Sequence, residues 1–332
     1  MGYGWDVGSN IESDIKRPSK NIKGSVYFFD PYILDSNVSG KFDIYARQEE
    51  YDQWRTISQP PQERVAGASA RFGLALPQIS RRLEAATEIG FETIYYKNHD
   101  TVSALGDNKA QTLSLFENRF RKGDLCWLCF DLVKDTRNHR IYPNRGFKVL
   151  FNTKTALPLI NRDYSFIKVE ADWSWYTPII GQDTLVLGLH SHAGIIDHIA
   201  SDKIIPYKEL FHMGGQTTVR GFTWGGIGPA WKANNDPVGA RKAILFNAEL
   251  IFPIIPDYSM KGHVFYDAGA GWDTPRHGID TMSLVTRNNF NVRHSVGFGL
   301  NLMKPSPVKI DWGYKLDRNR KAGESPHEFH IM

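Results

Sequence analysis

The feature that most constrains this chain is a hydrophobic pattern with a period of two residues, repeated in long segments. Over 164–177 alternate positions are apolar and the positions between them are mostly charged or polar. The same alternation recurs over 185–195 and 308–315. Because successive side chains of a strand point to opposite faces, each segment predicts a strand with one apolar and one polar face.

About fourteen segments of this kind are predicted, with no amphipathic helix of four turns between them. Many are longer than the five or six residues usual for strands of globular proteins. A tilted strand that crosses a bilayer needs about 9–11 residues, which is close to the lengths here. The predicted strands are 4–15, 20–30, 37–48, 63–77, 81–97, 123–135, 146–156, 163–178, 183–196, 243–253, 261–273, 292–304, 307–316 and 326–332.

The links between these segments alternate between short, turn-rich connections and long polar ones. Short turns on one side and long loops on the other are typical of outer-membrane barrels, as are aromatic residues at strand ends. A soluble β-sandwich or propeller is the alternative, and it would turn its apolar faces inward. We expect a single domain, since no low-complexity linker interrupts the chain. The long connections are 48–63, 98–122, 197–242 and 274–291.

Composition excludes several other classes of protein. No run of 18 apolar residues occurs and the mean hydropathy is −0.39, which excludes transmembrane helices but not transmembrane strands. A net charge of +4 over 332 residues gives no reason to expect nucleic acid as a partner. The first residues lack the basic flank and apolar core of a secretory signal. We therefore expect either an intracellular protein or the later part of a longer chain.

The 197–242 loop is long for a compact domain, and its centre carries a glycine-rich motif around one arginine. The glycines allow a tight backbone path and close packing. If this loop folds into a barrel interior, Arg220 leaves bulk water and needs carboxylate partners, for which Glu249 and Asp267 on the next two strands are the candidates. The alternative is an exposed loop arginine and two ordinary carboxylates. The motif residues are Gly214, Gly215, Val219, Arg220, Gly221 and Phe222.

Two other groups invite a metal or redox interpretation, and neither is favoured. His190 and His192 share one strand face near Asp197 and His198. We interpret them as polar residues of the barrel lumen rather than as metal ligands. Cys126 and the cysteine three residues later lie on opposite faces of a strand, so they should neither bridge nor share a metal. No catalytic or phosphate-binding motif occurs. We expect no metal, no cofactor and no enzymatic activity.

An ordered set of motifs resembles the BamA-type outer-membrane assembly superfamily. The glycine-rich loop with Val-Arg-Gly-Phe is followed by an Asn-Ala-Glu-Leu-x-Phe-Pro strand and then by Phe-Tyr-Asp-Ala-Gly. Each motif alone is weak, but together they span nearly the whole chain in the family's order. Three further stretches resemble family turns, namely 29–32 (Phe-Asp-Pro-Tyr), 135–146 (Asp-Thr-Arg-Asn to Pro-Asn-Arg-Gly) and 323–326 (Gly-Glu-Ser-Pro).

The resemblance implies about fourteen strands of a sixteen-stranded antiparallel transmembrane β-barrel in the outer membrane, with the long loop folded into the lumen. It assigns Arg220, Glu249 and Asp267 to the contacts that lock the loop, and Phe329 and Ile331 to the last-strand signal. The implied function is non-enzymatic insertion of barrel proteins, with unfolded outer-membrane proteins as clients, outer-membrane lipids and accessory lipoproteins as partners. The alternative is a two-partner-secretion-type translocation pore.

The chain also departs from the family pattern at both ends. The family's POTRA repeats and first two strands have no counterpart, and the chain stops short of the usual terminal aromatic residue. We therefore expect 1–332 to be the barrel portion of a longer protein.

Overall fold

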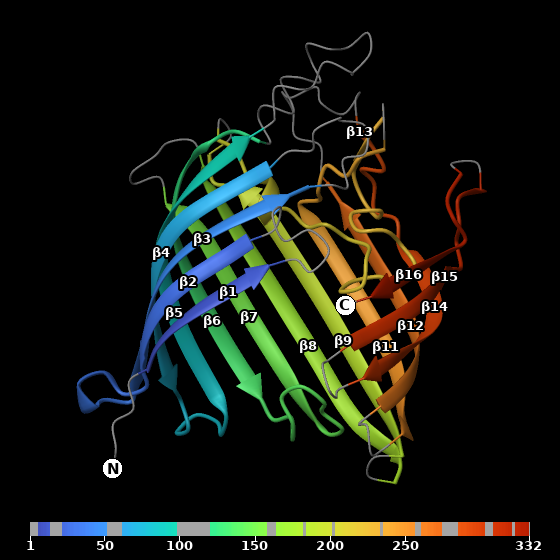
Figure 1. The fold of residues 1–332 in the computed structure, drawn as a ribbon, viewed down its shortest axis with the longest axis horizontal. Helices are drawn as coiled ribbons and strands as arrows, with labels where there is room; N and C mark the ends of the chain where they lie inside the picture. The colour runs from blue at the N-terminus through green and yellow to red at the C-terminus, as the bar shows by residue number, and fades with distance from the viewer. Residues whose placement is uncertain are drawn as a thin grey trace. The chain divides into compact units, whose positions relative to one another are not determined.

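The structure, a computed structural model, describes most of the chain as an all-β protein (Figure 1). Fourteen strands form one sheet in the order β1-β2-β3-β4-β5-β6-β7-β8-β9-β11-β12-β14-β15-β16. No helix in the described residues is long and apolar enough to cross a membrane. The described residues are 6–13, 22–51, 62–97, 120–157, 164–181, 184–200, 203–232, 235–255, 260–273, 285–302, 308–320 and 323–331.

Each of the fourteen predicted segments corresponds to one strand of this sheet, with ends that differ by a few residues. The strands are β1 (Asp6–Ser13), β2 (Ile22–Asp30), β3 (Val38–Glu50), β4 (Gln62–Ala75), β5 (Leu83–Lys97), β6 (Gly123–Asp135), β7 (Gly146–Leu157), β8 (Phe166–Ile180), β9 (Leu185–His198), β11 (Lys242–Ile255), β12 (Met260–Trp272), β14 (Arg293–Leu302), β15 (Val308–Lys315) and β16 (His327–Ile331).

The structure adds short elements that the sequence pattern did not predict. Two-residue strands β10 (Ala230–Trp231) and β13 (Val285–Thr286) pair within the long connections. The 3₁₀ turns η1 (Ile33–Asp35) and η3 (Tyr207–Glu209) lie in a short turn and in the long loop. Elements of two or three residues are too short to show a hydrophobic period, so alternation could not reveal them.

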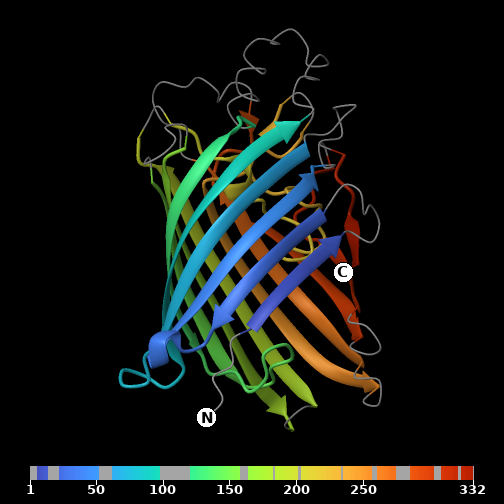
Figure 2. The same ribbon diagram turned by 60° about the vertical axis from the view of Figure 1, so that its left-hand side comes forward.

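The described residues form two compact units. The first comprises Met1–Val133, Phe151–Val169 and Ile196–Leu210, and the second comprises Lys134–Leu150, Glu170–Ile195 and Phe211–Met332. In the first unit β1 to β5 follow one another as continuous antiparallel ladders, seen side by side in Figure 2. In the second unit β9, β11, β12, β14, β15 and β16 do the same.

In the first unit the apolar side chains lie on the exposed face of the sheet. On β5, Ile89 and Phe91 are 47% and 37% exposed, whereas Glu92 on the opposite face is 4% exposed. A soluble sheet would bury the first two residues and expose the third. This inverted burial indicates a surface that faces lipid.

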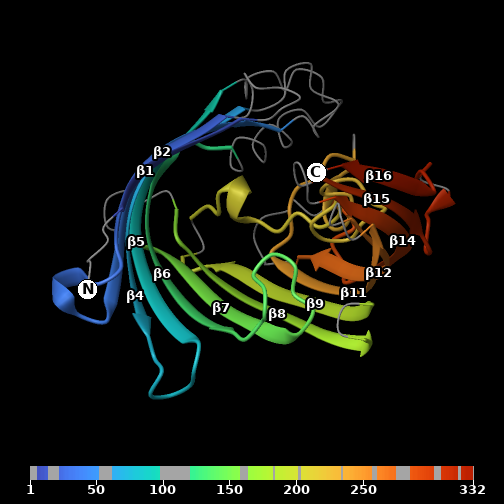
Figure 3. The ribbon, with the colours of Figure 1, turned by 60° about the horizontal axis from the view of Figure 1, so that its bottom comes forward.

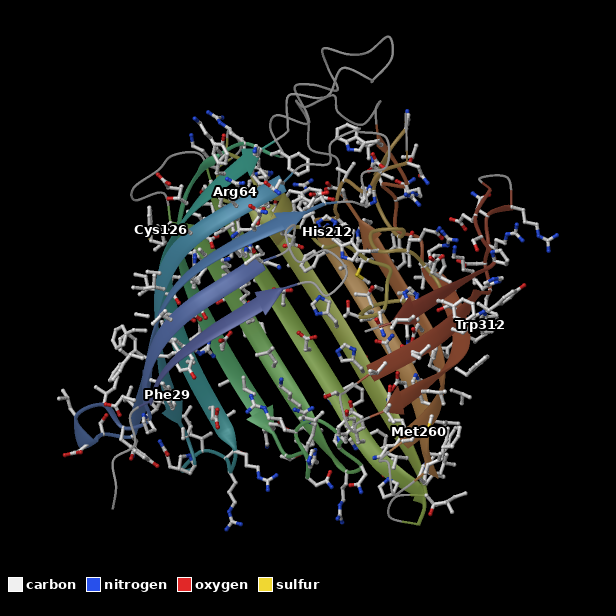
Figure 4. All side chains as sticks on the ribbon, viewed as in Figure 1. Phe29, Arg64, Cys126, His212, Met260 and Trp312 are labelled. Atoms are coloured by element: carbon white, nitrogen blue, oxygen red, sulfur yellow. The ribbon has the colours of Figure 1, made fainter. Side chains whose placement is uncertain are left out.

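The second unit has the same inverted burial. On β15, Ile310 and Tyr314 are each 42% exposed, whereas Asp311 is fully buried. Trp312, labelled in Figure 4, lies on the same face of β15 as these two residues and is partly exposed. The soluble sandwich or propeller is therefore excluded for this chain, because its apolar strand faces would meet in a dry interior.

A charge placed on the apolar face should therefore be costly. We expect Val169→Lys on β8, on the same face as the exposed Ile167, to destabilise the folded chain by about 2–4 kcal/mol if the site lies at mid-bilayer depth. The matched control is Ser174→Lys, on the opposite face of the same strand, which should cost much less. Urea unfolding in lipid vesicles, followed by tryptophan fluorescence, measures both. Near-zero cost at Val169 would mean that the two faces are assigned the wrong way round.

Candidate functional site

From Phe211 onward the long loop between β9 and β11 belongs to the second unit, where it folds back on itself (Figure 3). Phe211 and Ala240 form one antiparallel bridge, and Met213 bridges to Ile227. Directly after Met213 the backbone turns sharply at Gly214. Its φ is +103°, and an added Cβ would collide with a backbone carbonyl. Glycine is required there because other residues rarely adopt this conformation.

The turn at the tip of this loop presents Arg220, whose side chain is buried against β12. Its backbone N donates to Asp267 Oδ2 at 3.0 Å, its Nε donates to the same oxygen at 2.8 Å, and its Nη2 donates to Asp267 Oδ1 at 2.7 Å. Asp267 is fully buried. A two-pronged arginine–carboxylate pair fixes direction as well as distance, so the tip has one preferred seat on β12.

A second carboxylate and an aromatic ring complete the surroundings of Arg220. Its Nη1 donates to Glu249 Oε1 on β11, and the guanidinium lies 3.6 Å from the centre of the Phe265 ring. Burial by itself lowers the pKa of Arg220, but the hydrogen bonds to Asp267 and the charge of Glu249 outweigh it and raise the pKa. Arg220 therefore stays charged in this position.

The hydrogen bonds of Asp267 are also completed by a residue of the neighbouring strand. Asn247 of β11 donates through Nδ2 to Asp267 Oδ1 at 2.8 Å and to the carbonyl oxygen of Thr218 at 2.9 Å. Asn247 and Asp267 are directly opposite one another in the β11–β12 ladder. The amide thus links the strand pair to the loop, and it explains how a buried carboxylate is tolerated here.

Gly221 brings the loop backbone directly onto β15. A Cβ added at Gly313 would lie 2.6 Å from the Cα of Gly221, so the two glycines pack backbone against backbone. At this point the Gly221 N–H donates to His330 Nε2 of β16 at 3.0 Å. The loop tip is therefore attached to the last strand by a direct hydrogen bond.

The two apolar residues of the motif are buried on either side of the arginine. Phe222 is 2% exposed, with the Arg293 guanidinium 4.7 Å and the Lys315 ammonium 5.2 Å from its ring centre. Val219 is fully buried and packs against the Cα side of Gly269 on β12. The motif thus contacts β11, β12, β14, β15 and β16 on their polar face.

Several members of this site carry no signal in the local sequence. Asp311 Oδ2 lies 3.9 Å from Arg220 Nη1 and 3.6 Å from Lys309 Nζ, and Asp311 Oδ1 lies 2.7 Å from His263 Nε2. Asp311 was visible as a polar residue of an alternating strand. Nothing in the local pattern marked it as a neighbour of a loop some 90 residues earlier.

The histidines and cysteines that suggested a metal or redox site lie on β9 and β6. His190 Nδ1 is 3.0 Å from Asn247 Oδ1, and His192 Nδ1 is 3.1 Å from Asp172 Oδ1. Among the described residues no group of three or more potential ligands is arranged to hold a metal ion. Both cysteines are free, on β6. The predicted last-strand residues Phe329 and Ile331 are 65% and 62% exposed on the apolar face of β16.

Apolar exposed strand faces together with a buried loop arginine define a class: an outer-membrane β-barrel with a long loop bound to its polar face. Residues 2–331 match the Omp85 superfamily domain, and the chain belongs to that superfamily. It is an outer-membrane protein of the BamA type and not an enzyme. The family resemblance predicted from the motifs is thereby confirmed, as is the all-β barrel fold.

Two curated relatives are named as BamA proteins. The chain is 23% identical to the outer membrane protein assembly factor BamA of Neisseria meningitidis serogroup B, over 95% of this chain and 42% of that protein. It is 22% identical to BamA of Nitratidesulfovibrio vulgaris, over 91% of this chain and 34% of that protein. The chain therefore spans well under half the length of these relatives.

Solved structures agree on the fold. BamA from Haemophilus ducreyi lacking POTRA domains 1–3 superposes with a TM-score of 0.80 at 21% identity, over 100% of this chain and 64% of that chain. CdiB from Acinetobacter baumannii superposes with a TM-score of 0.58 at 12% identity, over 98% of this chain and 53% of that chain.

Proposed function

We propose that this chain is the barrel portion of an outer-membrane protein assembly factor, which inserts other β-barrel proteins into the outer membrane without a chemical step. The observation that carries the proposal is the loop tip, with Arg220 held by Glu249 and Asp267, seated on the strands that end in β16. The names of the BamA relatives support the same role.

The mechanism rests on the hydrogen-bonding groups of a strand edge. β1 and β16 are the end strands of the sheet that the described residues form. An end strand has unpaired N–H and C=O groups, and in a bilayer such groups are strongly driven to pair. A client strand, arriving unfolded, supplies the missing partners. The clients are thus unfolded outer-membrane proteins, and membrane lipids and accessory lipoproteins are the other proposed partners.

The loop tip has a definite role in this mechanism, that of a latch. Arg220 seats the tip on β11 and β12, while Gly221 contacts Gly313 and His330 on the last two strands. The latch holds β15 and β16 in one shape, so that the edge offered to a client keeps its register. Loosening Arg220 would let this edge fluctuate.

The test uses the chain refolded into lipid vesicles, to which a urea-unfolded outer-membrane barrel protein is added. Folding of the client is followed by the gel shift that folded barrels show without heating. Client folding should be faster than in protein-free vesicles and faster than with the Arg220→Ala variant. Equal client folding rates in all three samples would refute the assembly role.

A translocation pore of the same superfamily is the alternative function. Planar-bilayer recordings distinguish the two functions. A large, steady conductance without any acceleration of client folding would favour the pore.

A further inference from the structure

A second buried contact of the long loop lies in the first compact unit, outside the Arg220 site. The 3₁₀ turn η3, Tyr207–Glu209, is the short yellow coil in Figure 3. Although two of its three residues are charged, Tyr207 is fully buried and Glu209 is 7% exposed. Charged residues are seldom buried in a loop unless each one has a partner.

Both charges of this turn meet an opposite charge on a strand. Lys208 Nζ donates to Glu92 Oε1 of β5, and the other oxygen of Glu92 accepts a hydrogen bond from the Tyr45 hydroxyl at 2.9 Å. Lys154 Nζ of β7 donates to Glu209 Oε1 at 2.5 Å. A positive and a negative residue in succession therefore match a negative and a positive strand residue, an arrangement that admits only one orientation of the turn.

Tyr207 adds an aromatic contact between these two ion pairs. Its ring centre lies 4.8 Å from that of Phe120 and 5.0 Å from that of Tyr51. The Tyr51 and Tyr96 hydroxyls both donate to Glu63 Oε2, at 3.0 Å and 2.7 Å. The Tyr207 ring thus packs among buried aromatic side chains, and the buried carboxylate that bonds to Tyr51 has its hydrogen bonds satisfied.

The surroundings of Glu209 favour the ionised form of its carboxyl. Burial raises the pKa of its carboxyl, but the neighbouring Lys154 and Lys208 outweigh burial and lower the pKa to about 2. Glu209 is therefore ionised, and able to accept from Lys154, at every pH above the acid range.

We propose that Tyr207-Lys208-Glu209 is a second docking segment of the long loop, held by Glu92 of β5 and Lys154 of β7 independently of Arg220. The boundary between the two compact units falls between Leu210 and Phe211, directly after this turn. Release of Arg220 consequently frees the loop only from Phe211 onward, while its base stays attached. This inference concerns the loop's attachment and does not depend on the assembly role.

Hydrogen–deuterium exchange of the whole 332-residue chain, refolded in lipid, tests the proposal by comparing peptides 203–210 and 211–232. Glu92→Lys, which places two lysines together, should lower protection of 203–210 by on the order of 100-fold. The double variant Glu92→Lys/Lys208→Glu should restore most of it. Glu88→Lys is the matched control, since Glu88 lies on the same face of β5 but pairs with Arg71. It should leave 203–210 protected.

Independence from the latch is tested in the same experiment. Arg220→Ala should raise exchange in 211–232 and leave 203–210 unchanged. If Glu92→Lys fails to give a folded barrel, the same comparison is made with the other ion pair. The single variant Lys154→Glu should lower protection of 203–210, and the double variant Lys154→Glu/Glu209→Lys should restore most of it. The proposal is overturned if single reversals leave 203–210 protected, if the double reversals restore nothing, or if Arg220→Ala exposes both peptides.

Discussion

Arg220→Ala should weaken the seating of the loop tip by about 3–5 kcal/mol, the usual cost of leaving a buried charge without its partner. Asp267 would be that charge, since it is fully buried and loses three of its four hydrogen bonds. One of the three is donated by the backbone N–H of residue 220. It is lost as well, because the whole loop tip would move away from Asp267. Protection of peptide 211–232 against hydrogen–deuterium exchange reports the loss.

The barrel itself should still fold in this variant, because the strand ladders do not pass through Arg220. Lys232→Ala is the control, as Lys232 is an exposed residue of the same loop. Arg220→Lys should recover little, since an ammonium cannot make the two-pronged contact with Asp267. Unchanged exchange and unchanged heat-modifiability in Arg220→Ala would contradict the latch.

The partners of Arg220 allow a sharper form of this prediction. Arg220→Ala combined with Glu249→Gln or with Asp267→Asn should cost less than the sum of the single changes, by about 0.5–3 kcal/mol. The difference between the cost of the double variant and the sum of the single costs measures the coupling energy between the two residues. Once one partner is removed the ion pair is already broken, so removing the other partner costs little more. Strict additivity would mean that the three residues are neighbours without being energetically coupled.

Phe222→Ala should destabilise the seated tip by about 3–5 kcal/mol, the range for removing a buried phenylalanine. The ring is 2% exposed and lies against Arg293 of β14 and Lys315 of β15. The measurement is again the exchange of peptide 211–232. Thr223→Ala, at an exposed position next in sequence, is the control and should have little effect.

Phe222→Leu separates the two contributions of this side chain. Leucine keeps most of the apolar volume but removes the aromatic face that the two cations approach. If the cations contribute, Phe222→Leu should still cost about 0.5–2 kcal/mol. A leucine variant as stable as the parent would leave burial as the whole effect, and an alanine variant as stable as the parent would refute the packing role.

Much of this molecule could be read from alternation alone. The pattern in β15 predicted both a strand and its exposed apolar face, with Ile310 and Tyr314 outward. The same reasoning, together with the burial of an arginine, selected Glu249 and Asp267, and the structure brings both to Arg220. These inferences worked because strand geometry ties side-chain direction to position within a few residues.

Other members of the site had no local signal. Gly313 and His330 look ordinary in their strands, and they matter only because Gly221 of a distant loop rests on them. The turn at Tyr207 was likewise invisible, since three residues carry no period and their partners Glu92 and Lys154 lie more than 50 positions earlier.

By itself, the sequence determined the strands, the face of each strand that meets lipid and the loop arginine that needs acidic partners. Only the tertiary structure decided which strands the loop touches, that its tip bonds to the last strand, and that its base is held separately. The reason is physical: alternation acts between adjacent residues, whereas a loop contact depends on the register of many ladders and on where a long connection closes.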